Sequence, residues 1–296
     1  MKSVHGLTLA VCVLLSGCFL KQQPPPGTTT QGGKTGKVDG VIRMEEIRGA
    51  TPGATIEATF AIKSTGRNEG TEIALRDLIG IRAELASIRS ERTSDCKVIK
   101  VPTAADEMDR ATLLSAGKIF LTQANTSSSV AVPQDANGRY YKQLGLGLPT
   151  SLYNVIADGS EDVRKFEMSL SFPEPITQLT IGNEIVDDGI AIQKSSPLQL
   201  EWDQAAVPLE SHIVMLELYS EQPKEIHLLR CLGMESDFVS QAKRKWIVPP
   251  QYMAAMGATN NGLLFLSRIL ARSAGNSAMT VEAQGFQTQF ARVVLE

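Results

Sequence analysis

The sequence predicts a mainly β protein with two sandwich-like domains in tandem. Short segments in which apolar and polar residues alternate recur along the chain, and Gly, Pro, Asn and Asp residues separate them. The chain has 296 residues, of which 43% are hydrophobic, so it is long enough to form two cores of ordinary size. Together these observations favour two immunoglobulin-like β-sandwiches of about 110–140 residues each.

The first domain is expected to span residues 37–175. Three of its segments alternate clearly enough to be strands: residues 55–62, 118–122 and 166–172. The Asp135–Gly138 segment predicts a turn, because Asp, Asn and Gly are the residues that tight turns select. Pro173 and Pro175 end the last strand, since proline cannot donate to a β-ladder. We therefore place the domain boundary after Pro175.

Residues 75–92 fit two periodicities. Leu78, Ile81, Leu85 and Ile88 have helical spacing, whereas Ile79, Ile81, Ala83 and Leu85 have strand spacing. Arg, Ala, Glu and Leu favour a helix by propensity. The neighbouring segments favour a strand, and a strand is the expectation we adopt.

The second domain is expected to span residues 176–296. Its predicted strands are residues 198–202, 213–219, 226–231, 263–270, 279–283 and 290–295. A turn at 221–224 joins the second and third of these strands. Pro249 and Pro250 precede residues 251–256, and Gly257 follows them, which predicts one short helix.

The N-terminus resembles a bacterial lipoprotein signal peptide, spanning residues 1–17. Lys2 is followed by a short apolar run and by Leu15-Ser16-Gly17-Cys18, which resembles the site where signal peptidase cleaves and Cys18 is lipidated. An ordinary apolar helix and a plain signal peptide are the alternatives. Residues 18–36 are rich in Pro, Gly and Thr, and they predict a flexible tether beyond the lipid. Phe19, where retained lipoproteins carry aspartate, favours the outer membrane.

Charge and cysteine content narrow the function classes further. Without residues 1–17 the chain carries 28 basic and 32 acidic residues, which gives no electrostatic footprint for nucleic acid. Besides Cys12 and Cys18 it contains only Cys96 and Cys231. They are 135 residues apart and belong to different predicted domains, so we expect two buried free thiols in preference to a disulfide.

The densest basic cluster is Lys243-Arg244-Lys245-Trp246. Its simplest interpretation is a solvated loop before a strand. The sharper interpretation is an interaction patch for an anionic polymer, a lipid headgroup or a partner protein.

Other candidate sites are less specific. His212 and His227 could hold zinc or copper with Glu210, Glu217 or Glu225, but surface or edge-strand histidines are the favoured interpretation. Three acidic turns, beginning at Asp135, Asp158 and Asp187, lack the full calcium ligand pattern. No Gly-x-Ser-x-Gly motif nominates a nucleophile. We therefore expect no metal, no cofactor and no catalytic residue.

Several short motifs resemble a known group of proteins. These are Leu114–Ile119 with a "SAG" strand start, Asp162–Phe166 leading into Pro173, the P-L-x-L-x-W segment Pro197–Trp202, and Cys231 followed by Ile247–Pro250. The chain resembles uncharacterised secreted lipoproteins of myxobacteria and related delta-proteobacteria over most of residues 50–290. The resemblance implies two β domains on a lipid anchor and carries no activity.

The expected function is therefore that of a lipid-anchored envelope protein of the outer membrane. It would act without catalysis, as an interaction or structural module for another envelope protein or a surface polymer. The alternative is an extracytoplasmic hydrolase whose site assembles from scattered residues.

Overall fold

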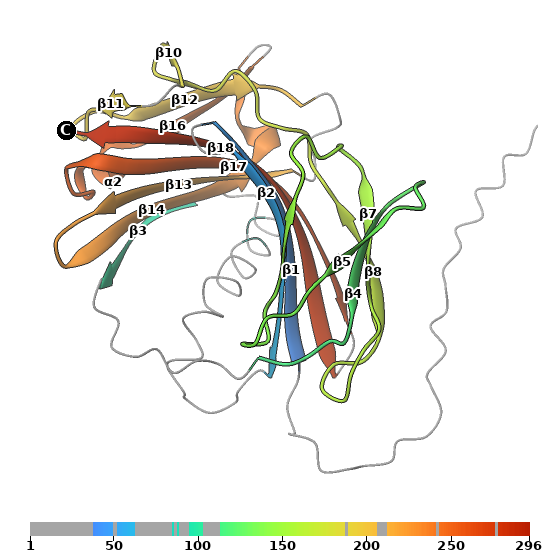
Figure 1. The fold of residues 1–296 in the computed structure, drawn as a ribbon. Helices are drawn as coiled ribbons and strands as arrows, with labels where there is room; N and C mark the ends of the chain where they lie inside the picture. Colours follow the sequence, from blue (N-terminus) through green and yellow to red (C-terminus); the bar gives the residue numbers. More distant parts are fainter. Residues whose placement is uncertain are drawn as a thin grey trace, which may run out of the picture. The chain divides into compact units, whose positions relative to one another are not determined.

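The computed structural model describes residues 38–49, 52–62, 85, 88, 95–102, 113–186, 189–205, 212–240, 243–275 and 278–296. These residues form a mainly β protein, as the sequence predicts (Figure 1). The first half contains β1 (Val38–Gly49), β2 (Gly53–Ile62), β3 (Asp95–Pro102), β4 (Ile119–Gln123), β5 (Ser129–Val132), β6 (Tyr140–Leu144), β7 (Leu152–Ala157) and β8 (Phe166–Ser171). The second half contains β9 (Thr180–Ile181), β10 (Glu184–Ile185), β11 (Ile190–Ile192), β12 (Leu198–Asp203), β13 (Ile213–Glu221), β14 (Glu225–Met234), η1 (Glu235–Asp237), β15 (Val239–Ser240), β16 (Lys243–Val248), α2 (Pro250–Ala254), β17 (Thr259–Gly275) and β18 (Met279–Leu295).

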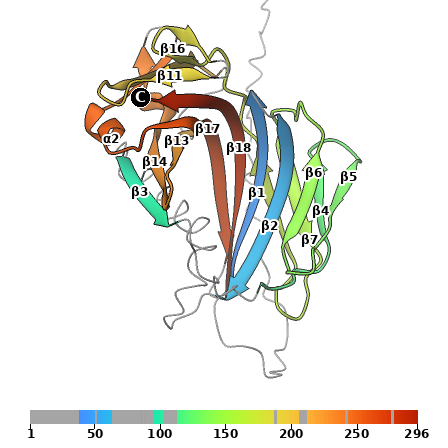
Figure 2. The same ribbon diagram turned by 60° about the vertical axis from the view of Figure 1, so that its left-hand side comes forward.

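One nine-stranded sheet unites strands from both halves of the chain. Its order is β3-β14-β13-β17-β18-β1-β2-β6, and β11 pairs with the far end of β18. β17 and β18 form a long antiparallel hairpin, and β1 runs parallel to β18 from Val38 opposite Met279 to Gly49 opposite Phe290 (Figure 2). The long strands β1 and β18 therefore tie the N-terminal end of the fold to its C-terminal end.

Two smaller sheets cover one face of this large sheet and enclose two cores. The face carries Val281 and Ala283 at one end of β18, where the four-stranded sheet β5-β4-β7-β8 packs. The same face carries Ala291 and Val293 at the other end, where the five-stranded sheet β10-β9-β12-β16-β15 packs. Each end is thus a sandwich with its own apolar interior.

A polar belt separates the two cores on the shared strands. Arg268 of β17, Gln287 of β18 and Glu46 of β1 lie in register across three neighbouring strands, and all three side chains are buried. Gly285 lies beside this belt, where a Cβ atom would collide with the backbone oxygen of Ser171. Pro175 lies between β8 of the four-stranded sheet and β9 of the five-stranded sheet, whereas the nine-stranded sheet takes strands from both sides of this predicted boundary.

The opposite face of the large sheet carries a third apolar cluster. Leu85 and Ile88 pack there against residues that include Ile269 and Phe286. Both Leu85 and Ile88 are helical, so the strand expected over residues 75–92 is wrong at these two positions. The i, i+3 spacing of Leu85 and Ile88 suits a helix that presents both side chains to the sheet.

A second correction concerns the end of the chain. The sequence predicts separate strands at 279–283 and 290–295, whereas β18 is continuous from Met279 to Leu295. Most residues between the two predicted strands are polar, but Gln284, Gln287 and Thr288 are buried within the strand. β18 pairs with β17 on one side and with β1 and β11 on the other, so its backbone is satisfied even where its side chains are polar.

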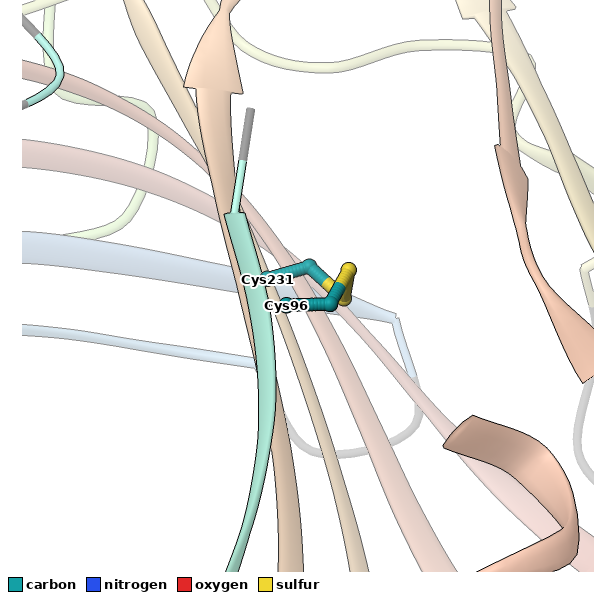
Figure 3. Close-up of a disulfide and its surroundings, with 2 residues drawn as sticks. All are labelled: Cys96 and Cys231. Carbon is teal, nitrogen blue, oxygen red and sulfur yellow. A yellow bond between two sulfur atoms is a disulfide. The ribbon is translucent and has the colours of Figure 1, made fainter. Parts of the chain in front are cut away.

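A third correction concerns the cysteines, which form a disulfide instead of two free thiols (Figure 3). Antiparallel pairing of β3 with β14 places Cys96 directly opposite Cys231, and their Cα atoms are 4.0 Å apart. The prediction was wrong because it assigned the two residues to separate domains. The disulfide attaches the edge strand β3 to the large sheet.

Candidate functional site

The predicted patch at 243–246 lies on a β-strand, so the expectation of a loop is wrong. Along β16 the side chains alternate between the two faces of the five-stranded sheet. Arg244 and Trp246 point inward and are 3% and 5% exposed. Trp246 stacks on Phe238, with ring centroids 4.3 Å apart. Of the four residues in the predicted patch, only Lys243 and Lys245 lie on the outer face of the sheet.

Acidic residues of β12 lie opposite these two lysines. Lys245 is paired in register with Glu201, and its Nζ lies 3.2 Å from Glu201 Oε1. Lys243 is paired with Asp203, and the next outward residue of β16 is Ile247, which is 52% exposed. The outer face of this sheet therefore carries a ladder of opposite charges ending in an exposed apolar residue.

A buried electrostatic cluster centred on Arg268 and Glu235 joins residues from both halves of the fold. Arg268 Nη2 lies 2.5 Å from Glu235 Oε1, and Arg268 Nε donates to Glu235 Oε2 at 2.8 Å. Arg268 also donates to the backbone oxygens of Glu174, Pro175 and Asp203. This one guanidinium therefore fixes the connection that follows β8 to the end of β12.

Two further side chains complete the surroundings of Glu235. Trp202 Nε1 donates to Glu235 Oε1 at 3.0 Å, and His212 Nδ1 lies 3.4 Å from Glu235 Oε2. Burial alone would raise the pKa of Glu235, but the contacts with His212, Arg268 and Trp202 lower it to about 2. The carboxylate is thus held ionised inside the protein.

The two histidines do not form a common site. β13 and β14 pair, but His227 lies opposite Ser220, whereas His212 precedes the other end of β13. His227 Nε2 lies 2.6 Å from Glu225 Oε1, and His212 belongs to the Glu235 cluster. Among the described residues, no group of three His, Cys, Asp or Glu side chains is arranged to hold a metal ion.

Two of the acidic turns are explained by local hydrogen bonds. Asp135 Oδ1 accepts from the backbone N–H groups of Asn137 and Arg139, and Ser160 Oγ accepts from those of Asp162 and Val163. These contacts stabilise the turns themselves. Asp187 and Asp188 lie outside the described residues.

A groove with a cavity volume of about 390 Å³ opens where the second sandwich ends. The β9–β10 turn, β11 and the start of β12 line it. Its floor includes Ile181 and Leu198, while Asn183, Gln193 and Gln199 supply polar groups. Sequence analysis did not identify this groove, because the three-residue strand β11 carries no alternation long enough to recognise.

The predicted signal peptide (1–17), lipidation residue Cys18 and tether (18–36) lie outside the described residues. In the part of the chain that is described, no helix has the length and apolar character needed to cross a bilayer.

Comparisons with known proteins add no family. No family model matches the chain, and no curated protein does so either. Among solved structures, a titin structure aligns with 69% of this chain and 91% of its own, at 5% identity and a TM-score of 0.17. The trypsin-activated alpha-2-macroglobulin of Escherichia coli aligns with 84% of this chain at 10% identity and a TM-score of 0.18. This chain spans only 15% of that protein's length, and both scores are too low to support an argument.

Proposed function

We propose that this protein is a lipid-anchored component of the bacterial outer membrane that acts without catalysis. Cys18 is the anchoring residue, and the double β-sandwich binds another envelope protein or a surface polymer. The resemblance to secreted lipoproteins of myxobacteria and related delta-proteobacteria belongs to the same proposal.

The observation that supports a role without catalysis is that the buried carboxylates named here form ion pairs or hydrogen bonds within the fold. Glu235 binds Arg268, Glu217 binds Arg230 at 2.7–2.8 Å, and Glu282 accepts from Ser273 and Gln284. Glu46 accepts from Arg48 and from the backbone N–H groups of Gly147 and Leu148. Groups with these contacts stabilise the fold, whereas a general acid or base needs access to substrate.

Binding then depends on features that face the solvent. These are the groove beside β11 and the outer face of the five-stranded sheet, where Lys243, Lys245 and Ile247 are candidate contact residues. Arg244 and Trp246 contribute to this face only by packing beneath it.

The test compares the native protein with a Cys18→Ala variant in the producing bacterium. We expect the native protein in the outer-membrane fraction with a lipid adduct on Cys18, and the variant in the soluble fraction. Cross-linking followed by gentle solubilisation should recover the native protein with a stoichiometric envelope partner. Membrane retention of the variant would overturn the anchoring, and recovery of the native protein alone would overturn the interaction.

A Lys243→Ala/Lys245→Ala variant then tests the outer face of the sheet. The matched control is Lys142→Ala/Lys224→Ala, which removes two positive charges elsewhere on the surface. Loss of the partner from the first variant alone would identify this face as the contact, and equal recovery from both would exclude the two lysines from it.

A further inference from the structure

Arg244 is a buried arginine whose charge the described residues do not balance. Among these residues the buried arginines are Arg230, Arg244 and Arg268, which are 6%, 3% and 0% exposed. Arg230 forms an ion pair with Glu217, and Arg268 forms one with Glu235. Arg244 forms no ion pair with a described carboxylate, and its Nε atom is buried without a hydrogen-bond partner. It therefore differs from the other two in lacking a counter-charge.

The acidic side chains of the neighbouring strand β12 lie on the wrong face to supply that charge. Glu201 and Asp203 are in register with the two outward-facing lysines of β16, so they share the outer face of the five-stranded sheet. Arg244 points to the inner face, because side chains alternate between the two faces of a strand. The sheet itself thus separates Arg244 from both carboxylates.

Glu235 lies on the inner side of this sheet, but its charge is already balanced. Trp202 is in register with Arg244, and its Nε1 donates to Glu235 Oε1. Arg268 Nε donates to the other oxygen of Glu235 at 2.8 Å, and His212 Nδ1 lies 3.4 Å from that same oxygen. The ion pair between Glu235 and Arg268 is neutral as a whole, so Arg244 leaves one uncompensated positive charge in this part of the interior.

The surroundings of Arg244 are largely aromatic. Trp202 lies opposite it on β12, and Trp246 follows it on the same face of β16, where it stacks on Phe238. These rings offer no anionic acceptor. A guanidinium stays protonated in proteins, so Arg244 cannot avoid the cost of burial by losing its charge. An anion bound beside it would remove that cost.

We propose that Arg244 binds a small oxyanion, such as sulfate, phosphate or a carboxylate, on the inner side of β16. Two N–H groups of a guanidinium are parallel, and they match two oxygens of one such group. Because Arg244 is only 3% exposed, the occupant is a free ion that enters through a small opening, and not a group carried on a polymer. This site lies beneath the outer face assigned to the envelope partner, so the inference does not depend on the proposed function.

The experiment measures the urea midpoint of the full chain in detergent as sodium sulfate replaces sodium chloride at constant ionic strength. An ion that binds only the folded state raises the midpoint in a saturable way, whereas the general effect of sulfate on apolar burial does not saturate. We expect half-saturation below about 10 mM sulfate. Equilibrium dialysis of the native chain with radiolabelled sulfate should give about one bound ion per chain at saturation.

Three variants test the role of the guanidinium. Arg244→Met keeps an unbranched side chain and should weaken sulfate binding by at least about tenfold. Without sulfate it should be at least as stable as the native chain, because it removes an uncompensated buried charge. Arg244→Lys keeps a positive charge but not the parallel donors, and should bind at least about threefold more weakly. The matched control Arg292→Met removes an exposed arginine and should bind within about twofold of the native chain.

Four results would overturn the inference. The first two are a midpoint that rises without saturation and equal sulfate binding by the native chain and Arg244→Met. The third is a destabilised Arg244→Met in sulfate-free buffer, which would show that Arg244 already has a partner within the chain. Dextran sulfate, which carries the same group on a polymer, provides the fourth: saturable binding that requires Arg244 would replace the free ion by a polymer.

Discussion

Arg268→Met tests the buried cluster that joins the two halves of the fold. The substitution preserves an unbranched side chain but removes the guanidinium group and with it five hydrogen bonds, two to Glu235 and three to backbone oxygens. It also leaves the Glu235 carboxylate buried without its cationic partner. Breaking such a pair costs about 3–5 kcal/mol, which is a large share of the 5–15 kcal/mol that is typical of a folded domain.

The assay is urea unfolding of the full chain with the disulfide intact, followed by the fluorescence of the buried residues Trp202 and Trp246. Glu235→Met should cost a similar free energy of unfolding, because it leaves the Arg268 guanidinium unpaired. The double variant should be more stable than the sum of the single costs predicts, by about 2 kcal/mol.

An exposed pair provides the matched control for this cycle. Lys245→Ala and Glu201→Ala remove a partly exposed ion pair, and their coupling energy should be at most about 1 kcal/mol. A cost below 1 kcal/mol for Arg268→Met, or strictly additive single costs at Arg268 and Glu235, would refute the reasoning.

Three further predictions concern stability. The pKa of Glu235 is lowered from 4.5 to about 2, so the stabilisation by its carboxylate is present above pH 4.5 and is lost as the pH falls towards 2. When the free energy of unfolding is measured across this pH range, the native chain should lose roughly 3 kcal/mol more than Glu235→Gln. Parallel curves for the two proteins would contradict this. Cys96→Ala/Cys231→Ala should lower the urea midpoint by the equivalent of about 3–5 kcal/mol, since the disulfide closes a loop of 135 residues; an unchanged midpoint would show that β3 does not need the disulfide. Gly285→Ala should destabilise the fold by more than about 2 kcal/mol, because the added Cβ atom would collide with the backbone oxygen of Ser171. In the control Gly145→Ala the added Cβ atom has no neighbour within 4 Å, so stability should change little. Equal melting temperatures of the two variants would refute this contrast.

The sequence predicts strands best where one face is apolar and the other polar. Residues 166–172 and 198–202 alternate strictly, and the structure confirms β8 and β12 there. The short helix after Pro249 is confirmed as well. These elements could be predicted because each one buries a single face, so the period of the sequence matches the period of burial.

The continuity of β18 could not be predicted from the sequence, because the alternation of apolar and polar residues is lost in the middle of this strand. Its residues change there from one apolar core to a polar belt and then to a second apolar core, and the stretch around Gln287 resembles a loop. Pairing with β17 and β1 decides its conformation, and pairing over such sequence distances leaves no local signal. The disulfide was missed for the same reason, since only the register of β3 on β14 places the two cysteines opposite each other.

The candidate sites show the same limit. The run Lys243–Trp246 suggested one basic patch, but strand alternation divides it between two faces. Conversely, the groove beside β11 leaves no signal in composition, because separate segments of the chain form it only once the sheets are paired.

The parallel pairing of β1 with β18 has a mechanical consequence. A pulling force that is applied at Val38 along the axis of β1 loads the strand in shear. Twelve residue pairs to β18 and ten to β2 share that load, whereas a strand pulled sideways would release its pairs one after another. The anchor proposed at Cys18 would therefore place its load on a part of the fold where many residue pairs share it.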